Sequence, residues 1–431
     1  MSPPRVAIVV QRYGAEINGG AELHARLLAG RLRAHYLVDV LTSRALDYQR
    51  WDRHYPAGES SLDDCRVLRF DHPERIRGGS GHMPLRHKLR FLLRRWMVPS
   101  AAGIVLRPSG DEVQDGESYL AAKGPTMTNL MDYLRAHHQD YAALIFVTAF
   151  FHPTAIGVLI DPGRSILVPT LHDEKGMYLP HYHRVFRAPR QIFYNTRAEQ
   201  ELAERLYGAD LAPGDVCGVG IDLPDSTPAS SAASAQRFVQ LAARYRLDGH
   251  YLLYVGRIDT AKGCAELFRY FIRLREHMPG RLKLVVCGQL FMEAPTHPDI
   301  VLTGFVDDTT RDTLLEHATA LIVPSRHESL SLSLLEGLAA GCPVIVNQHS
   351  AVLRQHVRDS GVGEVFADGD GFCAAVTRQL QMDPVARSVQ RARGRLYVDQ
   401  SYDWSRIIDK FRRAIEAGKA WLPASNPLND R

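Results

Sequence analysis

Short runs of β-branched and other apolar residues alternate with longer segments of helical pattern along most of this chain. Apolar runs of this length predict strands of parallel sheets that are buried on both faces and joined by crossover helices. The predicted strands are 6–10, 38–41, 67–70, 144–147, 166–168 and 192–194 in the first half, and 251–255, 282–286, 300–302, 321–323 and 344–346 in the second. The chain is therefore expected to be an α/β protein.

A segment without an apolar face divides these strands into two groups. Residues 224–235 read P-D-S-T-P-A-S-S-A-A-S-A, a composition that is typical of a linker. We predict two doubly wound domains at 1–222 and 236–400, a linker at 223–235, and a C-terminal helix and tail at 401–431. Because ligands of such sheets bind at the carboxyl ends of the strands, the site is sought in the loops that follow strands.

Composition excludes several classes of protein. Hydrophobic residues make up 45% and charged residues 23% of the 431 residues, which is typical of globular chains rather than disordered or fibrous ones. The formal net charge of +4 is too small for a protein that coats nucleic acid. No apolar run approaches the roughly 18 residues of a membrane span, and the N-terminal apolar stretch is too short for a secretory signal. Scattered cysteines without a C-x-x-C pair favour a reducing compartment, so we expect a cytoplasmic protein.

The most informative segment follows the predicted strand 321–323. A polar loop leads into a helix that is expected to start near Ser331, where the N–H groups of Ser331 and Leu332 would favour an anion. Glu328 precedes this helix and Glu336 lies inside it, roughly 12 Å further along the helix rise. Carboxylates accept hydrogen bonds from vicinal hydroxyls, so this arrangement suits a nucleotide-sugar. The alternative is an ordinary surface helix with a capping glutamate.

A second segment follows the predicted strand 251–255. Gly256 allows a close backbone approach, and Arg257 and Lys262 stand in one loop before a helix. Two fixed cations beside a helix start suit a diphosphate and could stabilise the charge of a departing nucleoside diphosphate. The alternative is a solvated Arg and Lys on a turn.

These two segments carry a resemblance to a known family. The pattern G-R-x-x-x-x-K-G, followed by E-x7-E within S-R-x-E-S-x-S-L-x-L-L-E-G-L-A-A-G-x-P-V-I, resembles the retaining GT-B glycosyltransferases of family 4, or glycosyl transferases group 1. The resemblance covers essentially the whole chain. It extends to G-G-A-E at 19–22, V-G-I-D at 219–222, G-F-V at 304–306 and Y-D-W at 402–404.

The resemblance implies a fold and an activity. It implies two Rossmann-like domains that face a central cleft, with the C-terminal helix closing back on the N-terminal domain. It also implies metal-independent, retaining transfer of a sugar from a nucleotide-sugar to a saccharide, lipid-linked or other hydroxyl acceptor, in bacterial polysaccharide, glycolipid or glycoconjugate biosynthesis. The favoured mechanism is attack on the front face of the sugar, with the leaving phosphate helping to deprotonate the hydroxyl.

The resemblance also implies roles for donor-binding residues. Arg257 and Lys262 would hold the diphosphate, Glu336 the ribose hydroxyls, and Glu328 the donor sugar. Further donor contacts would come from residues that follow strands or open helices: Gly20, Gly256, Gly288, Phe305, Val306, Ser329, Ser331 and Leu332. The family often has glycine where Ser329 and Ser331 stand, which makes the backbone conformation there less certain than the anion site itself.

The N-terminal domain is expected to hold the acceptor. His172 and Asp173 follow the strand 166–168 and resemble the family's V-H-D segment, so His172 is a candidate catalytic residue; alternatively it is a loop imidazole bonded to Asp173. His152 follows the preceding strand and is a second catalytic candidate. Gly19 and Glu22 are candidates on the acceptor side, although Glu22 could instead simply cap its helix.

Two other signals bear on metals and membranes. Asp368-Gly369-Asp370 matches a metal-binding D-x-D, but Asp370 suits the cap of a following helix, so we predict neither metal nor cofactor. Between 75 and 107 there are eight basic and no acidic residues, and leucines recur at helical spacing within 82–97. This segment either lies on an anionic membrane at the inner face or lines the path of an anionic acceptor.

Two rival functions remain open at this stage. A hydrolysing nucleotide-sugar epimerase has the same two-domain architecture, although the E-x7-E segment argues against it. A non-catalytic protein that binds a nucleotide-sugar would need the same donor motifs.

Overall fold

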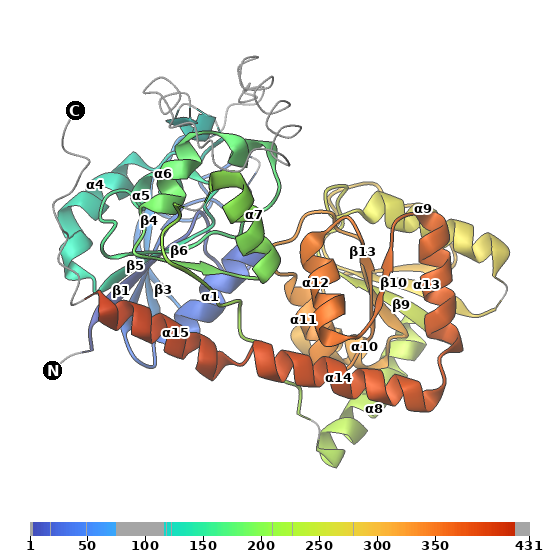
Figure 1. Cartoon of the computed structure of the whole chain (residues 1–431). Helices are drawn as coiled ribbons and strands as arrows, with labels where there is room; N and C mark the ends of the chain where they lie inside the picture. Colours follow the sequence, from blue (N-terminus) through green and yellow to red (C-terminus); the bar gives the residue numbers. More distant parts are fainter. Residues whose placement is uncertain are drawn as a thin grey trace. The chain divides into compact units, whose positions relative to one another are not determined.

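The computed structural model describes residues 3–74 and 116–418, apart from residues 18, 49, 118, 122, 209, 226 and 279 (Figure 1). The chain forms two compact units, Met1–Val219 with Ser405–Arg431 and Gly220–Trp404. Each unit is built on its own sheet, so the prediction of two α/β domains is confirmed. The basic segment 75–107, including 82–97, lies outside the described residues.

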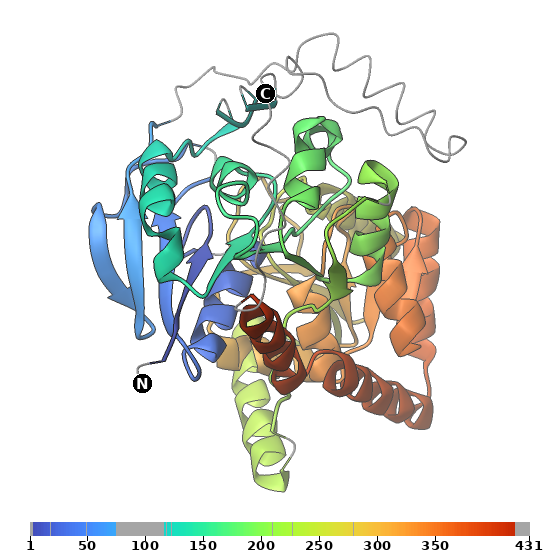
Figure 2. The same ribbon diagram turned by 60° about the vertical axis from the view of Figure 1, so that its left-hand side comes forward.

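The N-terminal unit contains an eight-stranded sheet in the order β3-β4-β2-β1-β5-β6-β7-β8. Its strands are β1 (Arg5–Val9), β2 (Leu37–Ser43), β3 (Gly58–Leu62), β4 (Cys65–Phe70), β5 (Ala143–Val147), β6 (Ser165–Val168), β7 (Gln191–Tyr194) and β8 (Gly214–Val216). Neighbouring strands are parallel except for β3, which pairs antiparallel with β4 at the outer edge of the sheet (Figure 2). The central strands β1 and β5 are almost entirely buried because their residues are apolar on both faces.

Several helices cover this sheet. They are α1 (Gly20–Leu32), α4 (Thr128–His137), α5 (His152–Gly157), α6 (His181–Arg187), α7 (Arg197–Tyr207) and α15 (Trp404–Ala417). The last of these, α15, lies near the end of the chain but belongs to the N-terminal unit, as expected. Its Phe411 packs on Phe193 of β7 with ring centroids 4.6 Å apart, and its Lys410 forms an ion pair of 2.9 Å with Asp215.

The second unit contains a six-stranded sheet in the order β11-β10-β9-β12-β13-β14, and all of its paired strands are parallel. Its strands are β9 (His250–Val255), β10 (Leu282–Cys287), β11 (Ile300–Gly304), β12 (Ala320–Val323), β13 (Val344–Asn347) and β14 (Glu364–Phe366). Its helices are α8 (Pro228–Tyr245), α9 (Cys264–His277), α10 (Asp308–His317), α11 (Leu332–Ala339), α12 (Ala351–Ser360), α13 (Gly369–Gln381) and α14 (Pro384–Ser401). On one face, α9 and α13 pack Phe271 and Phe372 against Leu252 and Ile322 of the sheet.

The prediction that residues 223–235 form a linker is wrong for most of this segment. Helix α8 begins at Pro228, so most of the predicted linker is helical. Thr227 caps this helix by accepting a hydrogen bond from the Ser230 N–H, and proline suits the first turn. The polar Ser234 is buried and donates its hydroxyl to Glu316 of α10. A helix can thus pack through small and polar side chains that an apolar pattern does not reveal.

The sequence also did not predict β3, β8 and β14. These strands are short or polar, and each of them lies at the edge of its sheet. Their extended conformation depends on pairing with a neighbour rather than on their own composition.

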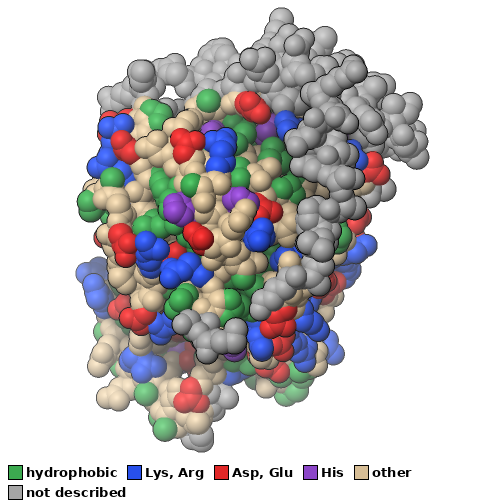
Figure 3. Space-filling view, turned by 90° about the vertical axis from the view of Figure 1, so that its left-hand side faces the viewer, with side chains coloured by type: hydrophobic (Ala, Val, Ile, Leu, Met, Phe, Trp, Pro, Cys, Tyr) green, Lys and Arg blue, Asp and Glu red, His purple; other side chains and the backbone are tan. Residues whose placement is uncertain are grey.

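The described surface of the N-terminal unit is charged and mixed. Figure 3 shows basic and acidic side chains interspersed over one face of this unit. Several form exposed ion pairs, including Arg26 with Asp63 and Arg66 with Glu59. Within residues 3–74 and 116–418, no helix combines the length and the apolarity that crossing a membrane requires.

Candidate functional site

The two donor motifs of the second unit meet at the carboxyl ends of neighbouring strands. The loop 256–263 follows β9, and the loop 324–331 follows β12, which pairs with β9. Gly263 has a positive φ of 79°, and a Cβ at this position would lie 2.5 Å from the Pro324 carbonyl oxygen. The Ser325 hydroxyl donates to the Lys262 carbonyl at 3.4 Å. The sheet thus brings together two segments that are distant in the sequence.

The charged side chains of these loops are paired with one another. Lys262 Nζ donates to Glu328 Oε1 at 2.8 Å, and Arg257 lies 3.1 Å from Asp259. Asp259 also accepts the Lys262 backbone N–H at 2.7 Å. The sequence analysis identified Arg257 and Lys262 as cations that could bind a diphosphate, but it did not identify Asp259. Because lysine has three N–H donors and arginine five, one carboxylate cannot use all the donors of either cation. The carboxylates therefore hold the cations in place.

Two glycines form the floor beside these charges. Gly256 follows β9 and Gly288 follows β10, and the Gly256 N–H donates to Cys287 at 3.0 Å. A Cβ at Gly288 would lie 1.9 Å from the Gly256 carbonyl oxygen, so no larger residue fits there without a backbone shift. The Gly288 N–H donates to Gly304 at 2.9 Å, which joins this floor to the loop after β11. In that loop Phe305 is 71% exposed, and Val306 is half-buried.

The start of α11 has an unusual backbone. The helix begins at Leu332, as expected, and Ser331 before it is left-handed, with φ 71° and ψ 79°. A non-glycine residue in this conformation is uncommon and often marks a functional site. The Ser331 Oγ is buried and has no hydrogen-bond partner among the residues that the structure describes. Because the first N–H groups of a helix lack partners within it, backbone and hydroxyl donors gather at this point.

Glu336 lies further along α11 beside Arg311 of α10. The Arg311 guanidinium is 3.6 Å from Glu336 Oε1 and also pairs with Asp308 and Asp312. Burial raises the pKa of Glu336 to about 7, and the arginine opposes this shift. The Glu336 carboxylate therefore gains or loses its proton near physiological pH.

In the N-terminal unit, Glu22 pairs with a buried arginine. Its Oε1 accepts from Arg12 Nη2 at 2.5 Å and Nε at 2.9 Å, and from Gln11 at 2.9 Å. The alternative that Glu22 merely caps α1 is wrong, because the N-cap position is Gly19 and the Glu22 carboxylate accepts from Arg12 and Gln11. A Cβ on Gly19 would lie 2.0 Å from Glu22 Oε2, whereas nothing lies within 4 Å of the corresponding position on Gly20. The structure thus leaves open space at Gly20.

The two candidate histidines follow the adjacent strands β5 and β6. His152 is buried at the start of α5, and its Nδ1 accepts the Met127 N–H at 3.4 Å. Burial lowers the pKa of His152 to about 4, so the ring is neutral and its remaining proton is on Nε2. His172 is partly exposed and lies 3.6 Å from Glu174. The His172–Asp173 bond of the alternative is not among the contacts of the described residues: the acidic neighbour of the His172 ring is Glu174, and Asp173 accepts from the Tyr178 hydroxyl at 2.7 Å.

The loop that carries His172 is joined to the loop after β7 by a residue that the sequence analysis missed. Glu199 of α7 is buried and accepts backbone N–H groups from Leu171, next to His172, and from Asn195 after β7. Thr196 caps α7 by accepting the Glu199 N–H at 3.1 Å. The T-x-x-E capping box at 196–199 is the signal that could have identified it. Burial raises the pKa of Glu199 to about 8 against these N–H donors.

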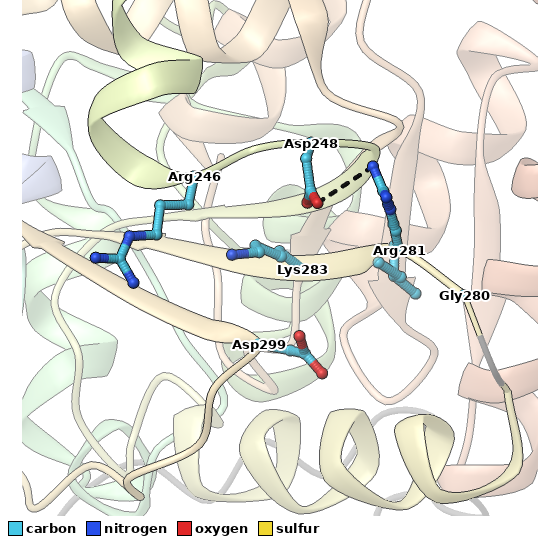
Figure 4. Close-up of a pocket in the computed structure, with 7 residues that line it drawn as sticks. Arg246, Asp248, Gly280, Arg281, Lys283 and Asp299 are labelled. Carbon is cyan, nitrogen blue, oxygen red and sulfur yellow. Dashed lines mark ion pairs between the residues drawn. The ribbon is translucent and has the colours of Figure 1, made fainter.

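A polar cavity of about 370 Å³ lies elsewhere in the second unit (Figure 4). Its lining residues precede β9 and β11 or lie around the start of β10: Arg246, Asp248, Gly280, Arg281, Leu282, Lys283 and Asp299. Arg281 pairs with Asp248 at 3.4 Å, and Asp299 pairs with Arg275 at 3.0 Å. The donor motifs follow the carboxyl ends of the strands, whereas this cavity lies near the amino ends of the strands, on the opposite side of the unit.

The D-x-D segment has structural partners. Asp368, rather than the expected Asp370, caps α13 by accepting the Gly371 N–H at 2.9 Å, and Asp370 pairs with Arg273 at 2.6 Å. The cap lies earlier in the chain than predicted because α13 begins at Gly369. Within the described ranges, no three histidine, cysteine or acidic side chains are grouped to hold a metal ion.

Comparisons with known proteins agree with these features. Residues 249–382, which contain both donor motifs, match the family model for glycosyl transferases group 1. The chain is 30% identical to the D-inositol 3-phosphate glycosyltransferase of Kineococcus radiotolerans over 54% of this chain and 59% of that protein. It is 32% identical to the glycogen synthase of Mycobacterium tuberculosis over 50% of this chain and 51% of that protein. The chain thus spans little more than half the length of these relatives.

The similarity in fold covers more of the chain than residues 249–382, which match the family model. The structure of Anabaena HepE in complex with UDP and glucose superimposes over 96% of this chain and 100% of that chain, with a TM-score of 0.62 and 14% sequence identity. At this identity the comparison concerns the fold alone. The chain has the two-domain α/β fold that is called GT-B.

Proposed function

We propose that this protein is a glycosyltransferase that moves a sugar from a nucleotide-sugar donor to a hydroxyl acceptor, with retention of the anomeric configuration. One observation carries the proposal: the left-handed Ser331 at the start of α11, whose buried hydroxyl has no partner among the described residues, in the loop whose Glu328 pairs with Lys262. This cluster lies within the segment that matches glycosyl transferases group 1. It supplies several donors to an anion from positions that are fixed before a ligand arrives.

The proposed reaction assigns each of these groups a task. The anomeric carbon–oxygen bond to the diphosphate breaks, and a new bond forms to the acceptor oxygen. The acceptor proton passes to the leaving phosphate, so no protein side chain needs to act as a covalent nucleophile. Arg257, Lys262 and the N–H groups at Ser331 and Leu332 stabilise the charge that develops on the diphosphate. Their ion pairs keep them oriented, which lowers the cost of reorganisation during the reaction.

The other site residues recognise the sugar parts of the donor. Glu336 accepts hydrogen bonds from the ribose hydroxyls, and Glu328 contacts the donor sugar next to Lys262. Gly288, Phe305 and Val306 border the base through backbone and an exposed ring. Gly20, where the structure leaves open space, approaches the phosphates from the N-terminal unit. Ser329 completes the loop before α11.

The acceptor is proposed to bind the N-terminal unit near His172 and His152. The two relatives are named for an inositol phosphate acceptor and for glycogen, so their names do not select one acceptor for this chain. We propose a saccharide or lipid-linked hydroxyl. Co-sedimentation with anionic and neutral vesicles tests the lipid-linked case, and binding that ignores lipid charge contradicts it.

The donor is tested first, by thermal shift with UDP, GDP, ADP, CMP and their sugars, because a ligand that binds the native state raises the melting temperature. The best donor is then incubated with an acceptor panel, and the product anomer is assigned by NMR. Transfer with retention is expected. Free epimerised sugar and nucleoside diphosphate without any acceptor would identify a hydrolysing epimerase instead. Tight donor binding without turnover on any acceptor would identify a non-catalytic binding protein.

Metal independence is tested in the same assay. We expect activity to remain within about twofold in excess EDTA, because Arg257 and Lys262 supply the positive charge for the leaving group. Complete loss of activity in EDTA, with recovery on addition of manganese, would contradict this part of the proposal.

A further inference from the structure

A buried histidine contacts the loop that precedes α11. His356 of α12 is fully buried, and its Nε2 lies 2.7 Å from the Leu330 carbonyl oxygen. Its Nδ1 lies 2.8 Å from the hydroxyl of Tyr397 on α14. No role for His356 follows from the donor motifs, because it lies on a different helix and does not itself belong to the loop.

The hydrogen bonds determine the tautomer of this imidazole. A carbonyl oxygen can only accept, so Nε2 must carry the proton that is shared with Leu330. Burial lowers the pKa of His356 to about 4, which keeps the ring neutral near pH 7. Nδ1 is therefore unprotonated and accepts the Tyr397 hydroxyl. Both ring nitrogens have one defined partner.

His356 donates to the peptide group that joins Leu330 to Ser331, the residue with the left-handed backbone. The Leu330 carbonyl and the Ser331 N–H are the two ends of one planar trans peptide, and they point in opposite directions. Ser331 has φ 71°, a conformation that is unfavourable for a residue with a side chain. A hydrogen bond to the carbonyl end therefore fixes the direction of the N–H end. Without it, rotation of this peptide would relieve the strain and turn the N–H away.

We propose that His356 is a positioning residue for diphosphate recognition, because its hold on the Leu330 carbonyl keeps Ser331 left-handed and its N–H directed at the anion. Tyr397 contributes by fixing the tautomer of His356. This inference rests on the proposed function, since it assumes that the start of α11 binds a nucleoside diphosphate. It names residues outside the loop that decide how the loop is preorganised.

The test is a comparison of four chains: wild type, His356→Leu, Ser331→Gly and the double variant. Each is titrated by calorimetry with UDP, GDP and ADP. His356→Leu is expected to weaken the tightest of these about tenfold, the effect of one lost hydrogen bond together with released strain. Glycine adopts positive φ without strain, so the same substitution in the Ser331→Gly background is expected to cost at most about threefold. His356→Gln, whose amide can donate to Leu330, should retain most of the affinity.

The comparison separates positioning from simple core filling. A histidine that only fills space would cause the same loss in the wild-type and Ser331→Gly backgrounds, and that outcome overturns the inference. Unchanged affinity in His356→Leu also overturns it while leaving the proposed function intact. Failure of the wild type to bind any of the three nucleotides contradicts both. His181→Leu is the matched control, because His181 is equally buried in the N-terminal unit and its Nε2 contacts a backbone carbonyl, that of Ala155, at 3.2 Å. It should leave nucleotide affinity unchanged.

Tyr397→Phe tests the tautomer of the His356 ring by NMR, in addition to the affinity measurements. Nitrogen-15 shifts of the His356 ring should show protonated Nε2 and unprotonated Nδ1 in the wild type. Loss of the tyrosine hydroxyl should allow a mixture of tautomers and weaken nucleotide binding about threefold, less than His356→Leu does. A wild-type ring with its proton on Nδ1 would contradict the proposed hydrogen bond to Leu330.

Discussion

The two units differ in how their candidate site residues are held. In the C-terminal unit four of the candidates contact one another: Lys262 pairs with Glu328, and Gly256 packs against Gly288. In the N-terminal unit the polar candidates bind residues that are not themselves candidates. Glu22 binds Arg12, and His152 accepts from the backbone N–H of Met127.

The order of the strands does not explain this difference, because the candidates of both units follow strands that are neighbours in their sheets. The donor loops follow strands that are neighbours in the sheet, so charges chosen from two separate motifs converge. The acceptor candidates also follow neighbouring strands, β1, β5 and β6, but the side chains that contact Glu22, His172 and Asp173 lie close to them in the chain: Arg12, Glu174 and Tyr178. The comparison teaches that the C-terminal residues should act mainly on donor binding and turnover, whereas Glu22 should act mainly on the stability of its unit.

The largest expected effect tests the N-terminal half of this comparison. Glu22→Ala leaves the Arg12 guanidinium buried without its carboxylate, which should lower the free energy of unfolding by about 3 kcal/mol. Hydrogen exchange of peptides from each unit in increasing urea measures the change. Asp63→Ala is the control, because it breaks an exposed pair with Arg26 and should cost less than about 1 kcal/mol. Full stability with lost transfer would instead make Glu22 a ligand-binding residue.

Glu328→Ala tests the C-terminal half. We expect kcat to fall about a hundredfold, because the change removes a contact to the donor sugar and the partner that orients Lys262. Donor affinity should change much less, whereas Glu336→Ala should mainly raise the donor dissociation constant. Steady-state kinetics and calorimetry separate the two quantities. Glu364→Ala, which removes a partly exposed carboxylate paired with Arg378, should leave both unchanged. Equal losses of affinity alone at 328 and 336 would refute the assignment.

Gly288→Ala tests the packing of the two glycines. The added Cβ would overlap the Gly256 carbonyl, so the C-terminal unit should lose about 2 kcal/mol of unfolding free energy. Gly280 also has a positive φ, 126°, but nothing lies within 4 Å of its Cβ position. Gly280→Ala therefore measures backbone strain without overlap and should cost clearly less. Equal costs in urea unfolding would show that the contact with Gly256 is unimportant.

The smallest expected effect is a pH dependence of donor affinity. Glu336, whose pKa is raised to about 7, is ionised above that pH and then accepts from both ribose hydroxyls. Protonation as the pH falls from 8 to 6 should weaken donor binding about tenfold by linkage. Calorimetry on wild type and Glu336→Gln separates this contribution from titration of the phosphates, which both share. Parallel pH profiles in the two proteins would exclude Glu336 as the titrating group.

Much of the fold was predictable because its signals are local. Val6 to Val9 and Leu252 to Val255 are apolar on both faces, and this composition identifies a central parallel strand wherever it occurs. By contrast, β3 reads G-E-S-S-L and is a strand only because β4 pairs with it. The helix from Pro228 was missed because Ser234 is buried through a hydrogen bond rather than through apolar area.

The sequence by itself determined the central strands of both sheets, where α11 begins, and which segments carry Arg257, Lys262, Glu328 and Glu336, because each depends on residues that are close in the chain. Only the tertiary structure decided that Lys262 meets Glu328, that Glu199 joins the loops after β6 and β7, and that His356 holds the Leu330 carbonyl. These contacts depend on the order of strands in the sheet and on burial. A buried polar group must find a partner wherever the fold brings one within reach, and no local pattern specifies which partner that is.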